Sequence, residues 1–480
     1  MPQMSRVAAA ALSPILPDVL FQRGEFARAR AGYRARRLYE GELRSLLRLD
    51  RWQEAIVVGE SAPAPTPEQE GLLSLAYLRA GQPQRARESA DWAWQRDPQA
   101  YWPLVARGTL ALRWDADPVA AGGFLRQATA LRPELAEGWL ALLAAPLDSQ
   151  EAARSAANLA RLEPRGYPFD FWSKPLRESA LNALRFTHAF PDGQVFCPVG
   201  ARLPVQTLRL KRDPRGMLYF DAEVDGQRMR LLYDTGGGRH FLLTPAAVAR
   251  LRPLFIASTV VTGLQGQSGG GLHRAERLRL DTLELRALPV ESAPANLGGF
   301  DGLVGWRVFG ERIQRLDLRQ NTLTLLERPS VQESGALQLP LHLILDQPVI
   351  GVRCRRRDQT AEIPLWAILD TGATEDFFSL RAGAQLTSRF RRGALQASIG
   401  IGQSHKRIET RSLAVGFDLL SQASQPLTSY SEATAASFLD TVHNPASGFE
   451  HGLLLGMDFI SRFTVIELDP VGRQVRLVPQ

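Results

Sequence analysis

The sequence predicts a multidomain α + β protein, in which a helical region is followed by a duplicated all-β region of two lobes. Up to about residue 165, alanine, leucine and arginine recur at helical spacing, with almost no runs of β-branched residues. Beyond about residue 190, short alternating segments are separated by Gly, Pro, Asn and Asp, as in strands joined by turns. Several motifs of this second region occur twice, at nearly constant separations.

Length and composition agree with several globular domains. At roughly 150 residues per domain, 480 residues correspond to about three domains. No apolar run approaches the ~18 residues that a membrane span needs, so we expect none. The net charge of +7 rests on 54 arginines and three lysines, a ratio that indicates the base composition of the genome more than selection for phosphate contacts. The basic runs are short and isolated, and we therefore expect no nucleic-acid partner.

The cysteines and the N-terminal residues bear on metal binding, on secretion and on the compartment of the protein. Neither Cys197 nor Cys354 belongs to a CxxC pair or to a cluster with histidine, so we expect no metal site and no cofactor. The apolar stretch Val7 to Leu12 is interrupted by Pro14 and makes a poor secretory signal. The compartment is left open, with the cytoplasm as the default and the periplasm as the alternative if the start codon is misassigned.

The helical region carries a repeat in the ends of its helices. Pro98, Pro133 and Pro164 each follow an amphipathic segment, at separations of 35 and 31 residues, and Gly81 is placed at a turn between paired helices. This pattern resembles the tetratricopeptide repeat, a helical hairpin of about 34 residues whose small residues let two helices approach closely. The resemblance covers roughly residues 15–165, within a region that we place at 1–190. An unrelated helical bundle is the alternative. In either case we expect this surface to bind a protein partner or substrate and to perform no chemistry.

The β region contains two copies of one motif. Asp234-Thr235-Gly236 recurs as Asp370-Thr371-Gly372, and each copy follows an apolar strand. Leu203-Pro204 and Leu339-Pro340, which are separated by the same interval as the two motifs, are each expected to open a strand. We therefore expect two homologous lobes, at 200–330 and 335–480. The hydrophobic-hydrophobic-Gly segments at 303–305 and 454–456 lie farther apart than the two motifs do. This longer interval predicts a short insertion in the second lobe, within 417–450.

Two Asp-Thr-Gly motifs, each preceded by a strand and followed by hydrophobic-hydrophobic-Gly, resemble the aspartic proteases, and the short lobes point to the retropepsin-like branch. In that family each lobe supplies one catalytic aspartate at the lobe interface. The threonine hydroxyl bonds across to the other lobe, the glycine permits a tight turn, and the hydrophobic-hydrophobic-Gly strand supports it. The resemblance assigns the catalytic role to Asp234 and Asp370. It assigns supporting roles to Thr235, Gly236, Thr371, Gly372, Leu303, Val304, Gly305, Leu454, Leu455 and Gly456.

The pairing of the two aspartates defines the expected chemistry. Two carboxyls held within ~3 Å cannot both ionise, so the dyad retains one proton. The ionised member takes a proton from a bridging water that attacks a peptide carbonyl, while the protonated member bonds the developing oxyanion. The sequence thus predicts an aspartic endopeptidase that acts on peptide or protein substrates. With both lobes in one chain, we expect a monomer with an intramolecular, pseudo-dimeric cleft.

A hairpin flap is expected in each lobe, because the substrate must be shielded from water during cleavage. The candidates are the glycine-containing segments 260–271 and 397–403, in which Gly263, Gly266, Gly400 and Gly402 permit bending. One departure from the family pattern follows the first motif, where Gly237 and Gly238 replace the usual small and hydroxyl residues. Since this removes a hydroxyl donor to the first aspartate, we expect a mildly acidic pH optimum.

Other readings carry less weight. Gly266-Gln267-Ser268-Gly269-Gly270 matches a serine nucleophile elbow, but a strand and not a helix is expected after it. His240 has no triad or ligand spacing, and Asp301 and Asp458 are expected to be structural. A catalytically inactive peptide-binding scaffold of the same fold remains the alternative to the enzyme, and pairing of each lobe with its copy in another chain is a third reading.

Overall fold

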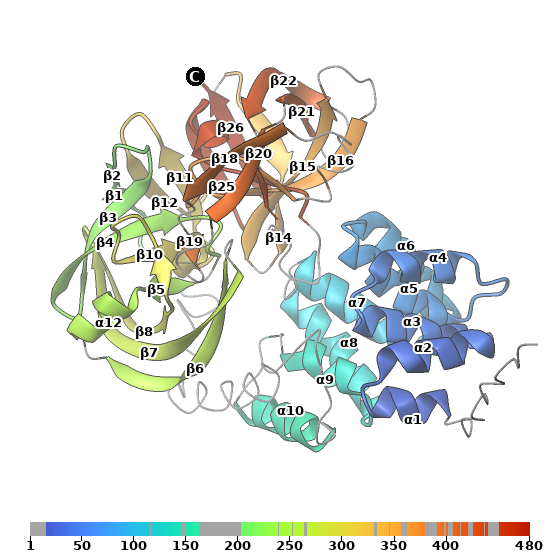
Figure 1. Ribbon diagram of the computed structural model, residues 1–480. Coiled ribbons are helices and arrows are strands. Elements are labelled where there is room, and N and C mark those ends of the chain that lie inside the picture. The colour runs from blue at the N-terminus through green and yellow to red at the C-terminus, as the bar shows by residue number, and fades with distance from the viewer. Residues whose placement is uncertain are drawn as a thin grey trace, which may run out of the picture.

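The computed structural model describes residues 16–162 and 203–480, apart from short gaps at 116, 144, 146–148, 239, 252, 264–265, 331–333, 345, 357–361, 380–381, 383–390, 398–399, 402–406, 413, 421–425, 436 and 440–450. The helices come first along the chain, and the strands follow in two lobes (Figure 1). Cys197 lies outside the described residues, whereas Cys354 is buried.

The described N-terminal residues form the predicted helical region. The last three helix pairs begin at Pro67, Tyr101 and Ala136, which are 34 and 35 residues apart. The second helix of each pair ends two residues before one of the prolines that the sequence analysis singled out. The helices are α1 (Pro17–Gln22), α2 (Phe26–Ala35), α3 (Tyr39–Arg48), α4 (Trp52–Glu60), α5 (Pro67–Arg79), α6 (Pro83–Arg96), α7 (Tyr101–Arg113), α8 (Pro118–Leu131), α9 (Ala136–Leu143) and α10 (Ser149–Leu162).

Small residues set the distances between neighbouring helices. A Cβ atom at Gly71 in α5 would lie 2.5 Å from the backbone nitrogen of Pro103 in α7. A Cβ atom at Gly108 in α7 would lie 2.5 Å from Cγ of Leu125 in α8. Both approaches are too close for any larger residue, so these glycines permit the tight packing of α7 against its two neighbours. Gly81 has a positive φ of 70° and turns the chain between α5 and α6, as predicted.

One six-stranded sheet joins the two β lobes. Its order is β1-β12-β11-β25-β26-β13, so that three strands from each lobe meet where β11 and β25 pair antiparallel. The strands are β1 (Gln206–Arg209), β11 (Ile313–Asp317), β12 (Thr322–Leu326), β13 (Leu337–Pro340), β25 (Phe463–Asp469) and β26 (Gln474–Pro479). The prediction that Leu339-Pro340 opens a strand is wrong, because Pro340 ends β13. Proline has no N–H to donate and is tolerated at a strand end. Leu203-Pro204 precedes β1, which begins at Gln206.

The first lobe is an eight-stranded sheet of order β2-β3-β4-β10-β5-β8-β7-β6. A short turn joins β3 and β4 through Asp225 and Gly226, both with positive φ (47° and 82°), as is typical of an Asp-Gly hairpin. The strands are β2 (Lys211–Arg212), β3 (Leu218–Val224), β4 (Gln227–Asp234), β5 (Phe241–Leu243), β6 (Leu254–Gly263), β7 (Gly266–Leu280), β8 (Leu283–Ser292) and β10 (Gly302–Gly305).

The second lobe is built around a sheet of order β22-β21-β15-β16-β24-β17-β23, with β14 paired to β15. Two of these strands, β22 and β23, lie within the predicted insertion at 417–450, and residues 440–450 lie outside the described part of the chain. The strands are β14 (His342–Ile344), β15 (Gln347–Arg356), β16 (Glu362–Leu369), β17 (Phe377–Ser379), β21 (Ala414–Leu420), β22 (Pro426–Ala435), β23 (Ser437–Leu439) and β24 (Leu453–Leu455).

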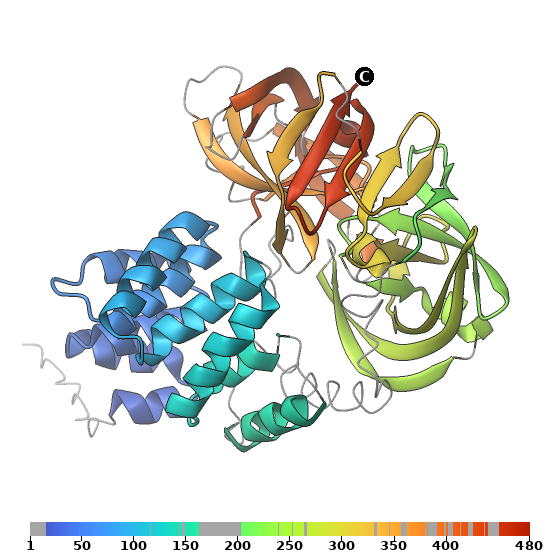
Figure 2. The same ribbon diagram turned by 180° about the vertical axis from the view of Figure 1, so that it is seen from behind.

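The helical region packs against the second lobe. The Trp366 indole N–H donates to the Gly81 carbonyl at 2.9 Å, and the Trp114 ring stacks on His342 with 3.9 Å between centroids. Three apolar side chains of the lobe, Ile344, Val349 and Ile368, belong to the same core cluster as the helices. Both views show the helical region next to the second lobe (Figures 1 and 2). The contact is therefore a packed, largely apolar interface.

Candidate active site

Two strand ends bring the predicted aspartates to the junction of the lobes. Asp234 is the last residue of β4, which pairs parallel with β10 so that Asp234 lies opposite Gly305. Asp370 directly follows β16, which pairs parallel with β24, and its backbone N–H donates to the Leu455 carbonyl at 2.9 Å. In each lobe, therefore, the hydrophobic-hydrophobic-Gly strand supports the turn that carries the aspartate.

The glycines that end these supporting strands are required by close backbone contacts. A Cβ atom at Gly305 would collide with the Gly238 carbonyl oxygen, and one at Gly456 would collide with the Glu375 carbonyl oxygen. Leu303, Val304, Leu454 and Leu455 are buried beside them. These contacts give a steric reason for the hydrophobic-hydrophobic-Gly pattern in both lobes.

The two threonines hold the turns together across the lobe interface. The Thr235 hydroxyl donates to the Leu369 carbonyl at 2.6 Å and accepts from the Thr371 N–H at 2.9 Å. Reciprocally, the Thr371 hydroxyl donates to the Tyr233 carbonyl at 2.8 Å and accepts from the Thr235 N–H at 3.0 Å. Both side chains are buried, so the four bonds are shielded from water and fix the relative position of the two aspartates.

Each Asp-Thr-Gly glycine lies against the aspartate of the other lobe. A Cβ atom at Gly236 would lie 2.6 Å from both carboxyl oxygens of Asp370, and one at Gly372 would lie 2.6 and 2.7 Å from those of Asp234. Backbone amides also hold the carboxyls. The Gly237 N–H donates to Asp234 Oδ1 and the Gly372 N–H to Asp370 Oδ1, both at 2.7 Å. The two carboxyls thus face one shared site between the lobes.

Burial, and for Asp370 also the charge of Asp234, shifts the titration of the two carboxyls. Burial raises the pKa of Asp234, against the opposing effects of a hydrogen bond with Asp370 and of backbone N–H groups. The pKa of Asp370 is raised well above its ordinary value, first by burial and then by the charge of Asp234 and the hydrogen bond with it. Since the pair interacts this closely, its two pKa values belong to the dyad as a whole. The arrangement favours a singly protonated pair over a wide pH range.

A histidine near the first aspartate was not predicted to have a role. The His240 backbone bonds Gly237 and Gly305, and its Nδ1 lies 2.6 Å from a Glu291 carboxylate oxygen. The charge of Glu291 is the main reason that the pKa of His240 is raised to about 9, and Asp346 and Asp234 add to it. In turn, the positive charge of His240 works to lower the pKa of Asp234.

The second lobe carries a carboxyl where the first carries this histidine. Asp376 lies as far after Asp370 as His240 lies after Asp234, so the two residues have the same spacing from the aspartates of the two motifs. Asp376 is 1% exposed and accepts from the Gly456 N–H at 2.8 Å, and burial raises its pKa to about 7. Their equal spacing from Asp234 and Asp370 is the sequence signal that relates these two residues. The residues at the same distance after the two aspartates therefore differ in kind, a histidine after Asp234 and a carboxyl after Asp370.

Of the predicted flap glycines, Gly263, Gly266 and Gly400 lie within the described residues. Gly263 and Gly266 pair opposite each other at the end of the β6–β7 hairpin. Gly400 lies in β19 (Gly400–Ile401), which pairs antiparallel with β9 (Ala295–Asn296) of the first lobe. The segment expected as the second flap thus reaches across to the first lobe. Gly402 lies outside the described residues.

The other motifs that were considered for a catalytic role are parts of the fold. The Gly-x-Ser-x-Gly match lies in the continuous strand β7, with no helix after the serine, so it is not a nucleophile elbow. Asp301 accepts from the Arg230 N–H at 2.9 Å and pairs with Arg250 at 2.6 Å, as a structural carboxylate does. Within the described ranges, no group of three His, Cys, Asp or Glu side chains is arranged to hold a metal ion. No described helix has the length and apolar character that crossing a bilayer requires.

Comparison with known proteins supports the resemblance for part of the chain. Residues 220–308 match the family model described as aspartyl protease, a stretch that contains the first Asp-Thr-Gly and Leu303-Val304-Gly305. Similar solved structures include a retropepsin-like aspartic protease from Rickettsia conorii, at 17% identity, over 25% of this chain and 91% of that chain, with a TM-score of 0.20. No curated protein matches the sequence. The family match confirms the resemblance to aspartic proteases that the motifs predict, over the part of the first lobe that carries Asp234.

Proposed function

We propose that the protein is an aspartic endopeptidase whose Asp234 and Asp370 activate a water molecule between two homologous lobes. The observation that carries the proposal is the reciprocal placement of the motifs, in which each glycine contacts the opposite aspartate and each threonine bonds the opposite strand. The aspartyl-protease match over residues 220–308 supports it. A purely structural turn has no need for two buried carboxyls, because burying paired charges is costly.

The geometry suits hydrolysis by a shared proton. The ionised carboxyl removes a proton from water as the water oxygen bonds to the peptide carbonyl carbon, and the protonated carboxyl hydrogen-bonds the developing oxyanion. The resulting tetrahedral intermediate breaks its C–N bond when the leaving nitrogen takes up a proton from the dyad. The products are a carboxylic acid and an amine, and the dyad returns to its singly protonated form.

We further propose that the cleft is complete within one chain. The six-stranded sheet joins the lobes through β11 and β25, and the four threonine bonds link residues of the same chain. The domain division that follows is a helical, tetratricopeptide-like region at 1–190 and lobes at 200–330 and 335–480, related by duplication. In this arrangement the helices hold a protein partner or substrate, and the flap segments around Gly263, Gly266, Gly400 and Gly402 cover the bound peptide.

A peptide-library digest tests the proposal. Purified wild type, Asp234→Asn and Asp370→Asn are incubated with the library between pH 3 and pH 8, and the products are identified by mass spectrometry. The proposal predicts cleavage by the wild type that both variants lose. If the wild type cleaves nothing that the variants do not also cleave, the chain is an inactive peptide-binding scaffold of the same fold. Activity that falls on dilution would instead show pairing between chains.

A further inference from the structure

Gln347 of the second lobe bonds the first Asp-Thr-Gly motif. Its side-chain amide N–H donates to the Gly236 carbonyl at 2.7 Å, so the bond crosses from one lobe to the other. Because a carbonyl oxygen can only accept, the amide nitrogen and not the amide oxygen must face it. Gln347 is partly buried, and its Oε1 is buried without a hydrogen-bond partner among the described residues. The bond to Gly236 therefore orients this side chain.

The carbonyl that Gln347 contacts belongs to the same peptide group as a donor to Asp234. Gly236 supplies the C=O of this group and Gly237 supplies its N–H. The N–H donates to Asp234 Oδ1 at 2.7 Å. Hydrogen bonds at the two ends of one peptide group polarise each other, so each is stronger than it would be alone. The bond from Gln347 thus makes the Gly237 N–H a better donor to the carboxylate of Asp234.

The second motif holds its aspartate through a different peptide group. Asp370 accepts from the N–H of Gly372, two residues on, whereas Asp234 accepts from that of Gly237, three residues on. Burial raises the pKa of Asp234, and the Gly237 N–H is among the groups that work against this rise. A stronger bond from this N–H therefore favours ionisation at Asp234.

The hairpin of β14 and β15 that carries Gln347 is fixed to the first lobe. The Asp346 carbonyl accepts from the Trp306 indole N–H at 2.6 Å, and the Asp346 carboxylate pairs with Arg307 at 3.3 Å. Both partners lie in the 3-10 helix η1 (Trp306–Phe309), which directly follows β10. The hairpin is therefore anchored beside the strand that supports the first aspartate.

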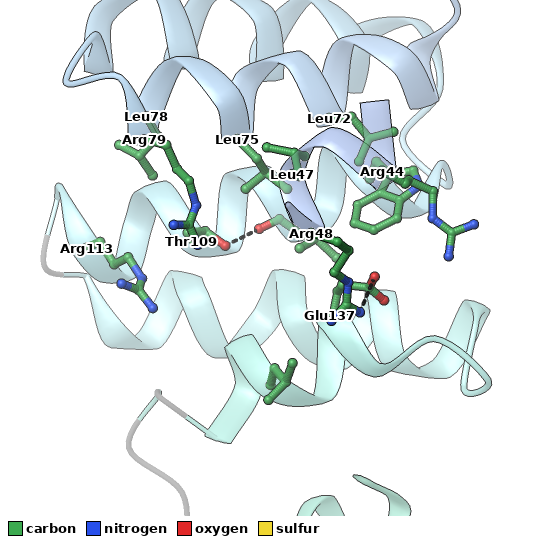
Figure 3. A pocket seen from close by; sticks show the side chains of 13 residues that line it. Arg44, Leu47, Arg48, Leu72, Leu75, Leu78, Arg79, Thr109, Arg113 and Glu137 are labelled. Atoms are coloured by element: carbon green, nitrogen blue, oxygen red, sulfur yellow. Dashed lines mark hydrogen bonds and ion pairs between the residues drawn. The ribbon is translucent and has the colours of Figure 1, made fainter. Parts of the chain in front are cut away.

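The same hairpin lies against the helical region. His342, the first residue of β14, stacks on the ring of Trp114, which directly follows α7. This helix is packed among its neighbours, since Arg113 of α7 and Arg79 of α5 line one pocket between α3, α5, α7 and α9 (Figure 3). Contacts with both the first lobe and the helices thus keep Gln347 in place.

We propose that Gln347 is a positioning residue of the dyad, which acts through the peptide group of Gly236 and Gly237 and favours the ionised form of Asp234. The inference rests on the proposed function, because it assigns Asp234 as the carboxyl that takes a proton from water. Asp370 is then the protonated member that hydrogen-bonds the developing oxyanion.

Other charged groups also act on the first aspartate. Asp370 acts from the second lobe and His240 from the first, and Glu291 and Asp346 act in turn on His240. Since Gln347 carries no charge, a neutral replacement leaves all of these groups in place. Its effect on the titration of the dyad therefore isolates the hydrogen bond.

Gln347→Met keeps the length of the side chain and removes its donor. With one library-derived peptide as substrate, we expect kcat to fall about three- to tenfold and KM to change by less than about twofold. The acid limb of the kcat/KM profile should move to higher pH, because a less stabilised carboxylate ionises later. Gln338→Met makes the same change at an exposed pair with Gln474 and should match the wild type. A rise in KM at constant kcat, or an unmoved acid limb, would overturn the proposal.

A double-mutant cycle in urea at pH 7 separates this inference from the proposed function, since it requires no cleavage. Gln347→Met should lower the urea midpoint more in the wild type than in Asp234→Asn, because a peptide N–H bonds a carboxylate more strongly than an amide. Gln338→Met should act equally in both backgrounds.

The cycle has one result that overturns the inference. Equal losses from Gln347→Met in the two backgrounds would show a bond that is merely structural. If Gln347→Met does not fold, Gln347→Ala, which adds no bulk, takes its place in both experiments. Unequal losses in a chain that cleaves no peptide would support the role of Gln347 and refute only the catalytic proposal.

Discussion

Gly236 occupies the space directly beside the carboxyl of Asp370, where a single added methyl group would lie 2.6 Å from both oxygens. Gly372 stands in the same relation to Asp234. Such reciprocity between lobes means that each motif shapes the surroundings of the other lobe's aspartate. The dyad is therefore a property of the interface, and changes at either glycine act on the opposite carboxyl.

Alanine at either glycine should abolish most of the activity. Gly372→Ala places a Cβ atom against Asp234, so the carboxyl must move from its position in the dyad, and we expect kcat/KM to fall by about a hundredfold or more. Initial rates on a cleaved library peptide measure this. Gly123→Ala is the matched control, since nothing lies within 4 Å of its Cβ position in α8. Full activity of Gly372→Ala would contradict the geometry.

The threonine bonds should contribute to stability independently of catalysis. Thr235→Val keeps the shape of the side chain but removes a bond to the Leu369 carbonyl and one from the Thr371 N–H, and leaves both groups buried. We expect the free energy of unfolding to fall by about 2–4 kcal/mol, and Thr235→Ser to stay within about 1 kcal/mol of the wild type. Urea denaturation measures both. Thr207→Val, at an exposed cross-strand pair, should change little, and an equally small effect at Thr235 would refute the shielded bonds.

The dyad should destabilise the fold at neutral pH. The pKa of Asp370 is raised in the folded state, so its contribution to stability is fully present below the unfolded value near 3.8 and is lost as pH rises through the folded pKa. Asp370→Asn should therefore be more stable than the wild type at pH 7, and the difference should shrink toward pH 4. Melting temperatures across this range test the prediction, with Asp221→Asn on an exposed strand position as the control. A difference that grows toward acid pH would reverse the sign and contradict it.

His240 should set the acid side of the pH profile. Its positive charge works to lower the pKa of Asp234, and the charge of Glu291 raises the pKa of the half-exposed His240. Removing that charge in His240→Gln should raise the dyad's pKa values and move the kcat/KM profile to higher pH. Lys211→Gln removes an exposed cation at the pair with Asp221 and should not move the profile. Superimposable profiles for wild type and His240→Gln would exclude this role.

The motifs allowed much of the site to be predicted, because each of its parts occurs twice in one chain and in the same order. The local sequence places Asp234 and Asp370 directly after apolar strands. It also places Gly305 and Gly456 at the ends of the supporting segments. His240 could not be found in this way, since its partner Glu291 is 51 residues away and is brought close by the parallel pairing of β5 with β8.

Two further features depend on packing that sequence spacing does not encode. The pairing of Gly400 with Asn296 joins segments of different lobes, and its register is set by how the lobes meet. The pocket arginines come from separate helices, so Arg79 and Arg113 face one space only after the helices pack. The wrong prediction that Leu339-Pro340 opens a strand has a simpler cause, because proline is compatible with either end of a strand.

Asp234 and Asp370 are proposed to act as one catalytic unit, and this is measured by the rate at which wild type, Asp234→Asn and Asp370→Asn cleave a single library-derived peptide. Rates are followed by mass spectrometry from pH 3 to pH 8. We expect a bell-shaped profile with a mildly acidic optimum for the wild type, and a loss of at least about a thousandfold in each variant. Cleavage that survives in either variant at a comparable rate would show that the two aspartates do not act as one catalytic unit.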